Sequence, residues 1–154
     1  MTELLHATTR EHILLVRQLF IEYQAALGFD LCFQDFKTEL ATLPGEYAPP
    51  RGRLLLACQD NKTAGCAALR EFSESICEMK RLYVRPEFRG GGIGKMLAVS
   101  LVSEAKKIGY EAMRLDTIPA MVEAIDIYRK LNFKEIPHYR HNPIPGALYF
   151  ELRL

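Results

Sequence analysis

The stretch Val84–Gly94, VRPEFRGGGIG, decides the fold of this 154-residue chain. The segment before it, Met79–Val84, is apolar and β-prone, and the segment after it, Lys95–Val99, is typical of the first turns of a helix. Glycines let backbone N–H groups converge without Cβ clashes, and a helix start adds unpaired N–H groups and a positive dipole end. With the charges of Arg89 and Lys95, this corner predicts a site for a phosphate or pyrophosphate.

Two common phosphate-binding motifs do not fit this corner. The phosphate loop of nucleotide hydrolases needs Gly-Lys-Ser/Thr, but Gly94 and Lys95 are followed by Met96. The dinucleotide fingerprint Gly-x-Gly-x-x-Gly would need its third glycine at Lys95 or Leu97. The alternative is a glycine-rich connection that binds no ligand. A plain connection needs only one or two glycines, and each further glycine loses more backbone entropy on folding than another residue would.

The pattern that does fit is Arg/Gln-x-x-Gly-x-Gly/Ala, which Arg89, Gly92 and Gly94 fill. It resembles the motif that binds the pyrophosphate of acyl-CoA in the GNAT superfamily of N-acetyltransferases. The resemblance implies that acetyl-CoA is the co-substrate, and that the end of the preceding strand offers backbone groups to its pantetheine arm and thioester carbonyl. The residues expected to bind acetyl-CoA are Leu82, Tyr83, Val84, Arg89, Gly90, Gly91, Gly92, Ile93, Gly94, Lys95 and Ala124.

The rest of the chain has the element order of the GNAT fold. Apolar periodicity, helix caps and turn signals predict the order β-α-α-β-β-β-α-β-α-β-β. The resemblance implies one α/β domain over residues 1–154, with a central mixed, mostly antiparallel sheet flanked by helices and central strands that separate beside the glycine corner. Strands are expected at 4–7, 53–58, 63–72, 75–84, 112–116, 133–139 and 147–154, and helices at 10–27, 35–43, 92–108 and 119–131.

The segment Glu123–Phe133, EAIDIYRKLNF, carries a second pattern. GNAT proteins commonly have Asn-x-x-Ala-x-x-hydrophobic-Tyr-x-x-x-Gly-Phe at this place. This chain matches that pattern at Ala124, Ile127, Tyr128 and Phe133. Asn132 replaces the glycine, and asparagine also tolerates a left-handed helix end. Met121 stands where the family has asparagine, so it cannot make the hydrogen bonds of an amide.

The resemblance makes Tyr128 the general acid that protonates the departing thiolate of CoA. A phenol titrates near about 10 and a thiol near about 8.5, so the phenol keeps its proton at neutral pH. The alternative is a tyrosine that packs against the end of its helix, with its hydroxyl in solvent.

Glu78 is the candidate general base, because it matches the position of a base glutamate in GNAT members that acetylate histones. Strand alternation predicts that Glu78, Lys80, Leu82 and Val84 share one face. A carboxyl group with an ordinary pKa near about 4.3 is a weak base, so it would need burial or would act through a chain of water. The alternative is an ion pair of Glu78 with Lys80 or with a cation on the next strand.

Composition limits the partners of the chain. The formal net charge is +1, which gives no electrostatic reason for binding nucleic acid or an acidic membrane surface. We see no secretory signal and no apolar run long enough for a membrane span, and we expect a cytoplasmic protein. No His, Cys and carboxylate cluster has ligand spacing, so no metal is expected. The four cysteines are interpreted as buried free thiols, and they are Cys32, Cys58, Cys66 and Cys77.

The function that follows from the resemblance is direct transfer of an acetyl group from acetyl-CoA to the primary amine of a small molecule, in a ternary complex. One alternative is a CoA-binding sensor or interaction module without turnover, against which Tyr128 and Glu78 argue. Another is an enzyme that acetylates proteins, although the near-neutral charge gives no attraction towards basic tails. GNAT proteins often form dimers, so a homodimer is also possible.

The acceptor itself is not specified by the sequence. In GNAT folds the last hairpin helps to form the wall of the acceptor pocket, so Tyr139 or Arg140 can contact the substrate; the alternative is a polar edge strand. Asp116 can bind an acceptor amine or cap the helix that follows it. The loops at 48–53 and 141–146 decide the acceptor, and their shape does not follow from one sequence.

Overall fold

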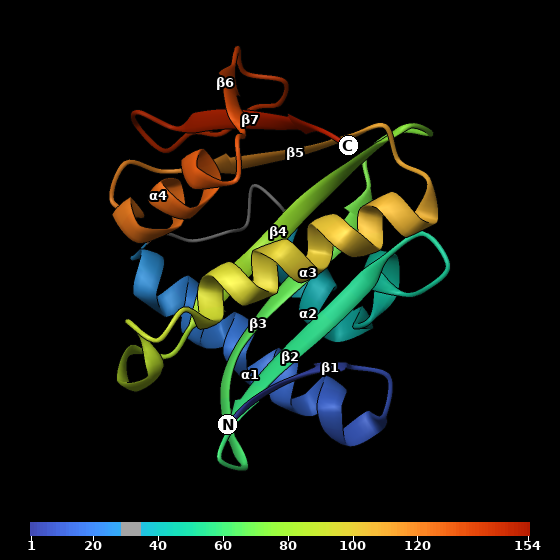
Figure 1. Cartoon of the computed structure of the whole chain (residues 1–154), viewed down its shortest axis with the longest axis vertical. Helices are drawn as coiled ribbons and strands as arrows, with labels where there is room; N and C mark the ends of the chain where they lie inside the picture. Colours follow the sequence, from blue (N-terminus) through green and yellow to red (C-terminus); the bar gives the residue numbers. More distant parts are fainter. Residues whose placement is uncertain (29–34) are drawn as a thin grey trace.

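The computed structural model describes residues 1–28 and 35–154, and the strands of this part form one seven-stranded sheet (Figure 1). The strand order is β1-β2-β3-β4-β5-β7-β6, with β4 and β5 parallel and all other neighbours antiparallel. The predicted mixed, mostly antiparallel sheet is therefore confirmed. The strands are β1 (Thr2–His6), β2 (Arg53–Gln59), β3 (Lys62–Glu71), β4 (Ile76–Val84), β5 (Ala112–Thr117), β6 (Lys134–Ile136) and β7 (Leu148–Arg153).

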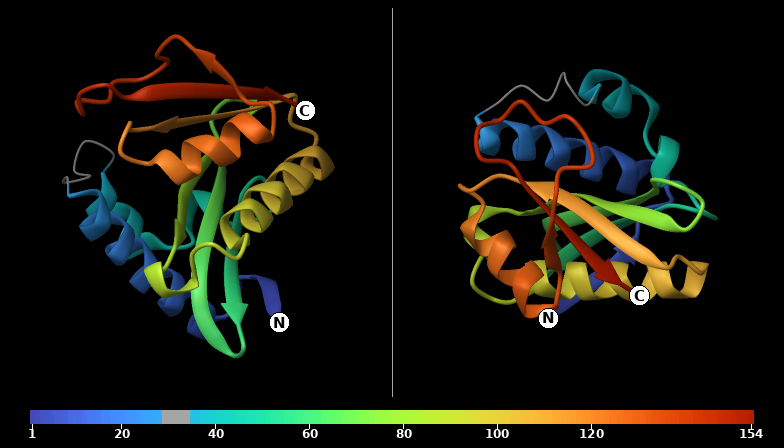
Figure 2. Two further views of the ribbon diagram at one scale, coloured as in Figure 1. Left: turned by 60° about the vertical axis from the view of Figure 1, so that its left-hand side comes forward. Right: turned by 90° about the horizontal axis from the view of Figure 1, so that it is seen from above.

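Helices cover both faces of the sheet. Seen from above, α1 and α2 lie on one side of the strands and α3 and α4 on the other (Figure 2). Each side has its own apolar core, built around Phe20 of α1 on one face and around Leu97 and Leu101 of α3 on the other. The helices are α1 (Arg10–Leu27), α2 (Phe36–Thr42), α3 (Ile93–Ile108) and α4 (Val122–Lys130), with short 3-10 helices η2 (Gly45–Tyr47) and η3 (Pro86–Phe88).

Local signals in the sequence form the expected caps and turns. Thr9 accepts a hydrogen bond from the backbone N–H of His12 at 3.1 Å and caps α1. Asp60 and Asn61 both have positive φ angles in the tight turn between β2 and β3. Asn132, at φ 73°, takes the left-handed conformation predicted from its place in the glycine position. These elements therefore follow from local sequence.

Two boundaries differ from the prediction by three residues. The helix expected from Pro119 begins at Val122, because Pro119 and Ala120 form a turn after β5. The strand expected over residues 133–139 is limited to Lys134–Ile136, since Pro137 has no N–H to continue the ladder.

The strands β4 and β5 separate after a short paired stretch. They pair only at Ile76–Glu78 of β4 and Ala112–Arg114 of β5, although both strands continue beyond these residues. Figure 1 shows β5, β7 and α4 above the part of the sheet formed by β1–β4. The backbone groups at the end of β4 are therefore not paired with β5, as the predicted separation of the central strands requires.

A β-bulge lies in β4 at Arg81. Lys80 is opposite Ala68 and Tyr83 is opposite Cys66, so β4 has one more residue between these pairs than β3. Arg81 is this extra residue, and its φ angle of 59° lies in the left-handed region. Its buried guanidinium group pairs with Glu39 of α2, with Nε at 2.9 Å and Nη2 at 3.0 Å from the two carboxylate oxygens.

The bulge makes the predicted strand alternation wrong. Glu78, Lys80, Leu82 and Val84 do not share one face, because the extra residue turns the end of the strand over. Leu82 and Val84 pack in the core on the α3 face of the sheet. Lys80 is paired with Ala68 of β3, and Ala68 belongs to the core on the α1 face. A bulge changes which side of a strand a residue faces without changing the alternating pattern in the sequence.

The described part of the chain contains no helix that is both long and apolar enough to span a membrane. Cys66 and Cys77 are buried free thiols, as predicted, whereas Cys58 is a half-buried free thiol. Cys32 lies outside the described residues.

Candidate active site

The glycine corner and α4 form the two walls of a groove of about 650 Å³. Gly90 and Gly92 have φ angles of 88° and 85°, which only glycine adopts without strain, and Gly92 is the N-cap of α3. The N–H groups of the first turn of α3 are left without helical partners, which favours an anion at this end of the helix. The corner therefore has the left-handed glycines and the helix start on which the predicted anion site depends.

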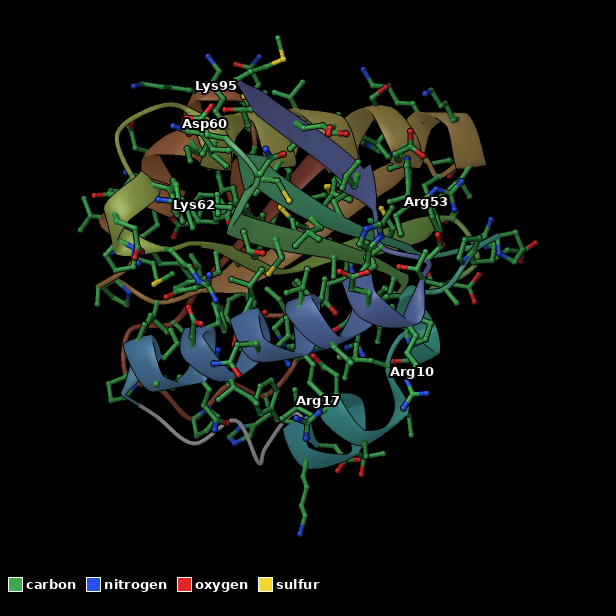
Figure 3. The ribbon with its side chains drawn as sticks, turned by 90° about the horizontal axis from the view of Figure 1, so that it is seen from below. Arg10, Arg17, Arg53, Asp60, Lys62 and Lys95 are labelled. Atoms are coloured by element: carbon green, nitrogen blue, oxygen red, sulfur yellow. The ribbon has the colours of Figure 1, made fainter. Side chains whose placement is uncertain are left out.

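Most of the residues expected to bind acetyl-CoA line this groove. It contains Leu82, Tyr83, Val84, Arg89, Gly90, Gly92, Ile93, Gly94, Lys95 and Ala124, which leaves only Gly91 of the predicted set outside its lining. Figure 3, viewed from below, shows that Lys95 lies on the α3 side of the sheet, opposite Arg17 on α1. The structure thus brings residues of β4, α3 and α4 together at one surface.

The other residues that line the groove were not among those predicted to bind acetyl-CoA. These residues are Phe88, Ala120, Met121, Val122, Glu123, Asp126, Ile127 and Lys130. The pattern at 123–133 marked α4 as functional, but only the packing of α4 beside α3 shows which of its residues face the groove.

Gly94 of α3 packs closely against α4. A Cβ atom at this position would lie 3.1 Å from Cδ1 of Ile127 and 3.7 Å from Cγ2 of Val84. A side chain here would force the tip of Ile127 to shift, so the glycine allows α3 and α4 to approach closely beside the groove.

A second, inner cavity lies where β4 and β5 separate. Its internal volume is about 40 Å³, and it lies between Lys80 of β4, Asp116 of β5 and Tyr128 of α4. Leu82 and Met121 line both this cavity and the groove. The two sites therefore meet at the end of β4, beside the expected position of the thioester. Met121, which replaces the family's asparagine, is apolar at this junction.

Tyr128 lines the inner cavity and is almost fully buried. Its ring packs against Phe133 and Phe150, with centroids 5.7 and 6.2 Å away. Burial raises the pKa of the Tyr128 phenol above its ordinary value, and the nearby Tyr23 and Asp116 raise it further. The phenol is thus protonated at neutral pH, as a general acid must be, and the side chain that carries it is buried beside a cavity and is not exposed to bulk solvent.

Glu78 is fully buried in a cluster of cations and is absent from the lining of both the groove and the inner cavity. Its Oε1 accepts a hydrogen bond from Nε of Arg70 at 3.0 Å, and its Oε2 accepts one from the Tyr139 hydroxyl at 2.6 Å. Burial by itself would raise the pKa of this carboxyl, but Lys80, Arg140, the hydrogen bond from Tyr139 and Arg70 together lower it. This environment favours the ion pair with a cross-strand cation, since Arg70 lies directly opposite Glu78.

Asp116 is the carboxylate that lines the inner cavity. Its side chain is only 5% exposed, and its Oδ2 accepts a hydrogen bond from Nδ2 of Asn142 at 3.1 Å. Nζ of Lys80 lies 4.0 Å from Oδ1, which is too far for a hydrogen bond. Burial, followed by repulsion from Arg81, lowers the pKa of the Lys80 ammonium group to about 8. The cavity therefore holds two opposite charges near Tyr128.

The last hairpin brings Tyr139 and Arg140 to Glu78. Tyr139 is bound to Glu78 and stacks edge-on against Phe72 and Tyr149. Arg140 lines an open pocket of about 280 Å³ with the loop that follows it.

Comparison with known proteins agrees with this geometry. The profile of the acetyltransferase (GNAT) family matches residues 15–133. An uncharacterized N-acetyltransferase of Schizosaccharomyces pombe is 41% identical over 140 residues, which cover 90% of this chain and 86% of that protein. An IAA acetyltransferase of Azospirillum brasilense is 34% identical over 106 residues, which cover 68% of this chain and 69% of that protein.

Solved structures share the fold. A GNAT-family acetyltransferase of Staphylococcus aureus superimposes with a TM-score of 0.82 at 18% identity, over 99% of both chains. An acetyltransferase of Elizabethkingia anophelis, solved with acetyl-CoA bound, gives a TM-score of 0.57 at 22% identity, over 67% of this chain and 76% of its own. The family profile and the yeast relative span most of the chain, so the chain belongs to the acetyltransferase (GNAT) family.

Proposed function

We propose that this N-acetyltransferase transfers the acetyl group of acetyl-CoA to the primary amine of a small molecule by direct attack in a ternary complex. The observation that carries the proposal is the meeting of the groove and the inner cavity at Leu82 and Met121. Donor and acceptor can then be bound together, one on each side of the end of β4. An inner cavity of about 40 Å³ suits an amine head group better than a bulky one.

The groove supplies the donor site. The backbone N–H groups around Gly92 and the charges of Arg89 and Lys95 are suited to the pyrophosphate of CoA. The pantetheine arm would follow the unpaired backbone at the end of β4 towards the inner cavity. We assign acetyl-CoA binding to the same residues that the sequence predicted.

The chemistry requires that the acceptor ammonium ion lose two protons. The amine nitrogen attacks the thioester carbonyl, the C–S bond breaks, and the amide forms as the CoA thiolate leaves. We assign Tyr128 as the general acid that gives its proton to the thiolate and is reprotonated from the reacting nitrogen through the solvent in the cavity. The second proton leaves through a base.

The general base that takes this proton is either Glu78 or a chain of water molecules. Both carboxylate oxygens of Glu78 are bound, so it would act through Tyr139 or through water and would not touch the amine. Asp116 lines the cavity and would hold the ammonium ion before it loses its proton. Two variants separate these roles. If Glu78 is the base, Glu78→Gln changes the acidic limb of the pH profile of kcat/KM. If Asp116 binds the ammonium ion, Asp116→Asn mainly raises the KM of the acceptor.

The test is a thiol-release assay with acetyl-CoA and a panel of amino acids, polyamines, aminoglycosides and peptides with free N-termini. We expect release of CoA with at least one small amine, with intersecting initial-rate lines that indicate a ternary complex. Acetyl-CoA without an acceptor is the control for hydrolysis. Binding of CoA without transfer to any acceptor would support the sensor instead, and transfer to peptides alone would support a protein acetyltransferase.

A further inference from the structure

The open pocket at the last hairpin adjoins the inner cavity. Asn142 and Ile144 line both, in the same way that Leu82 and Met121 connect the inner cavity to the groove. The groove, the inner cavity with Asp116 and the open pocket beside Arg140 therefore adjoin one another in this order. An acceptor with its amine in the inner cavity would extend towards the open pocket.

Arg140 has more hydrogen-bonding capacity than its neighbours use. A guanidinium group carries five N–H donors. Among the described residues, its one ion-pair partner is Glu78, with Nη2 3.3 Å from Oε1, and its Nε is buried without a hydrogen-bond acceptor. Its side chain is 21% exposed and lines the pocket with His138 and His141.

The carboxylate of Glu78 does not satisfy Arg140, because it has other partners. Arg70 donates to the same oxygen that faces Arg140, and Tyr139 donates to the other. One buried carboxylate is thus shared by two arginines. A partly exposed guanidinium group with spare donors at an open pocket is a site for a carboxylate or phosphate group, both of which arginine binds through paired hydrogen bonds.

We propose that the acceptor is a primary amine that also carries an anionic group, with its amine at Asp116 and its anion at Arg140. The inference rests on the proposed function, since it names the substrate class of the same site. The carboxylate of an amino acid and the phosphate of a phosphorylated amine share this chemistry. Asn142 lies between the two ends and holds Asp116 by a hydrogen bond of 3.1 Å.

The experiment measures kcat/KM for matched pairs of acceptors. Each L-α- or ω-amino acid is compared with its carboxamide, and O-phosphoethanolamine is compared with ethanolamine, so the two arms separate a carboxylate site from a phosphate site. We expect one arm to favour its anionic member by about tenfold or more, the ratio expected for hydrogen bonds to a charged group.

Arg140→Gln should remove this preference by raising the KM of the anionic acceptor, with the neutral partner and the KM of acetyl-CoA unchanged. Arg140→Lys should retain part of it, because the charge remains without the planar fork. Arg17→Gln is the matched control, since Arg17 is an exposed arginine on α1, across the sheet from the groove (Figure 3).

Three results would overturn the inference. If the enzyme uses both members of every pair equally, this inference is rejected, whereas the proposed N-acetyltransferase function is not. An equal loss for both members in Arg140→Gln shows that Arg140 only holds Glu78. Absence of transfer to every pair also rejects this inference, and the proposed function fails with it only when the polyamines and aminoglycosides of the wider panel accept no acetyl group either while CoA still binds.

Discussion

Tyr128 is the residue whose hydroxyl the proposed chemistry needs. We expect Tyr128→Phe to keep the fold and the affinity for CoA, because the ring still packs against Phe133 and Phe150. The hydroxyl acts only as the thiolate leaves, so the loss should be in kcat. General-acid catalysis contributes about 10²–10⁴-fold, and a thiolate is already a fair leaving group, so we expect a decrease near the low end.

Tyr110→Phe is the matched control for this experiment. The Tyr110 hydroxyl donates to the carbonyl of Arg51 at 2.7 Å, and its ring is also buried. This variant should lose about 1 kcal/mol of stability without any change in kcat. A Tyr128→Phe enzyme that turns over at the wild-type rate, under conditions where chemistry limits the rate, would leave Tyr128 as a packing residue.

Glu78 gives a second prediction at this scale, because a buried carboxylate among cations is a source of stability. Removing one member of a buried ion pair costs about 3 kcal/mol or more, so Glu78→Gln should lower the free energy of unfolding at pH 7 by this order. The surface glutamate Glu135, 3.9 Å from Arg129, is the control, and Glu135→Gln should cost less than about 1 kcal/mol.

The difference in free energy of unfolding between wild type and Glu78→Gln should become smaller as the pH falls. The pKa of Glu78 is lower in the folded protein than in the unfolded chain. Its contribution is therefore present above the unfolded value of about 4.3 and disappears as the pH falls through the folded value. Urea unfolding of both proteins between about pH 7 and pH 3.5 measures it. A gap between wild type and Glu78→Gln that widens towards acid would contradict this account.

At the scale of the element, the two ends of α3 provide a matched pair of glycines. Gly92 begins the helix at φ 85° and Gly109 ends it at φ 107°, and a Cβ atom at either position would meet no atom within 4 Å. Both substitutions to alanine carry the same kind of backbone strain, of order 1 kcal/mol or more. Only Gly92 lines the groove.

We therefore expect Gly92→Ala to weaken CoA binding by about tenfold or more, each 1.4 kcal/mol being one factor of ten. Gly109→Ala should lose similar stability and keep the wild-type affinity. Titration calorimetry on the two folded variants measures the difference. Equal CoA affinities in Gly92→Ala and wild type would defeat the assignment of the pyrophosphate to this corner.

At the scale of the whole molecule, the groove joins two parts of the sheet that separate beyond Glu78 and Arg114. CoA would contact β4 and α3 on one side and α4 on the other, so binding should stabilise the fold against unfolding. At a CoA concentration 100 times Kd the gain is about 2.7 kcal/mol. For a chain of this length that corresponds to a rise in Tm of about 5–10 °C.

A thermal melt with and without CoA measures this gain, and Gly92→Ala gives the internal control. Its rise in Tm at the same CoA concentration should be smaller, whereas the rise in Gly109→Ala should match the wild type. The same full rise in all three proteins would mean that CoA binds elsewhere.

The sequence by itself determined the elements of this protein and the residues of its proposed donor site. The glycine corner, the caps at Thr9 and Gly28, and the left-handed Asn132 depend on interactions within a few residues, which a local pattern records. The groove residues from β4 and α3 were predicted for the same reason, since the strand, the corner and the helix are continuous in the chain.

Only the tertiary structure decided the acceptor side. The bulge at Arg81 reversed the predicted facing of Leu82 and Val84, because an extra residue in one strand is visible only against its partner. Glu78 was placed among Arg70 and other cations by strand pairing, and Asp116 was brought to Tyr128 by the separation of β4 from β5. These contacts join residues far apart in sequence, and packing, which no local pattern encodes, sets their geometry.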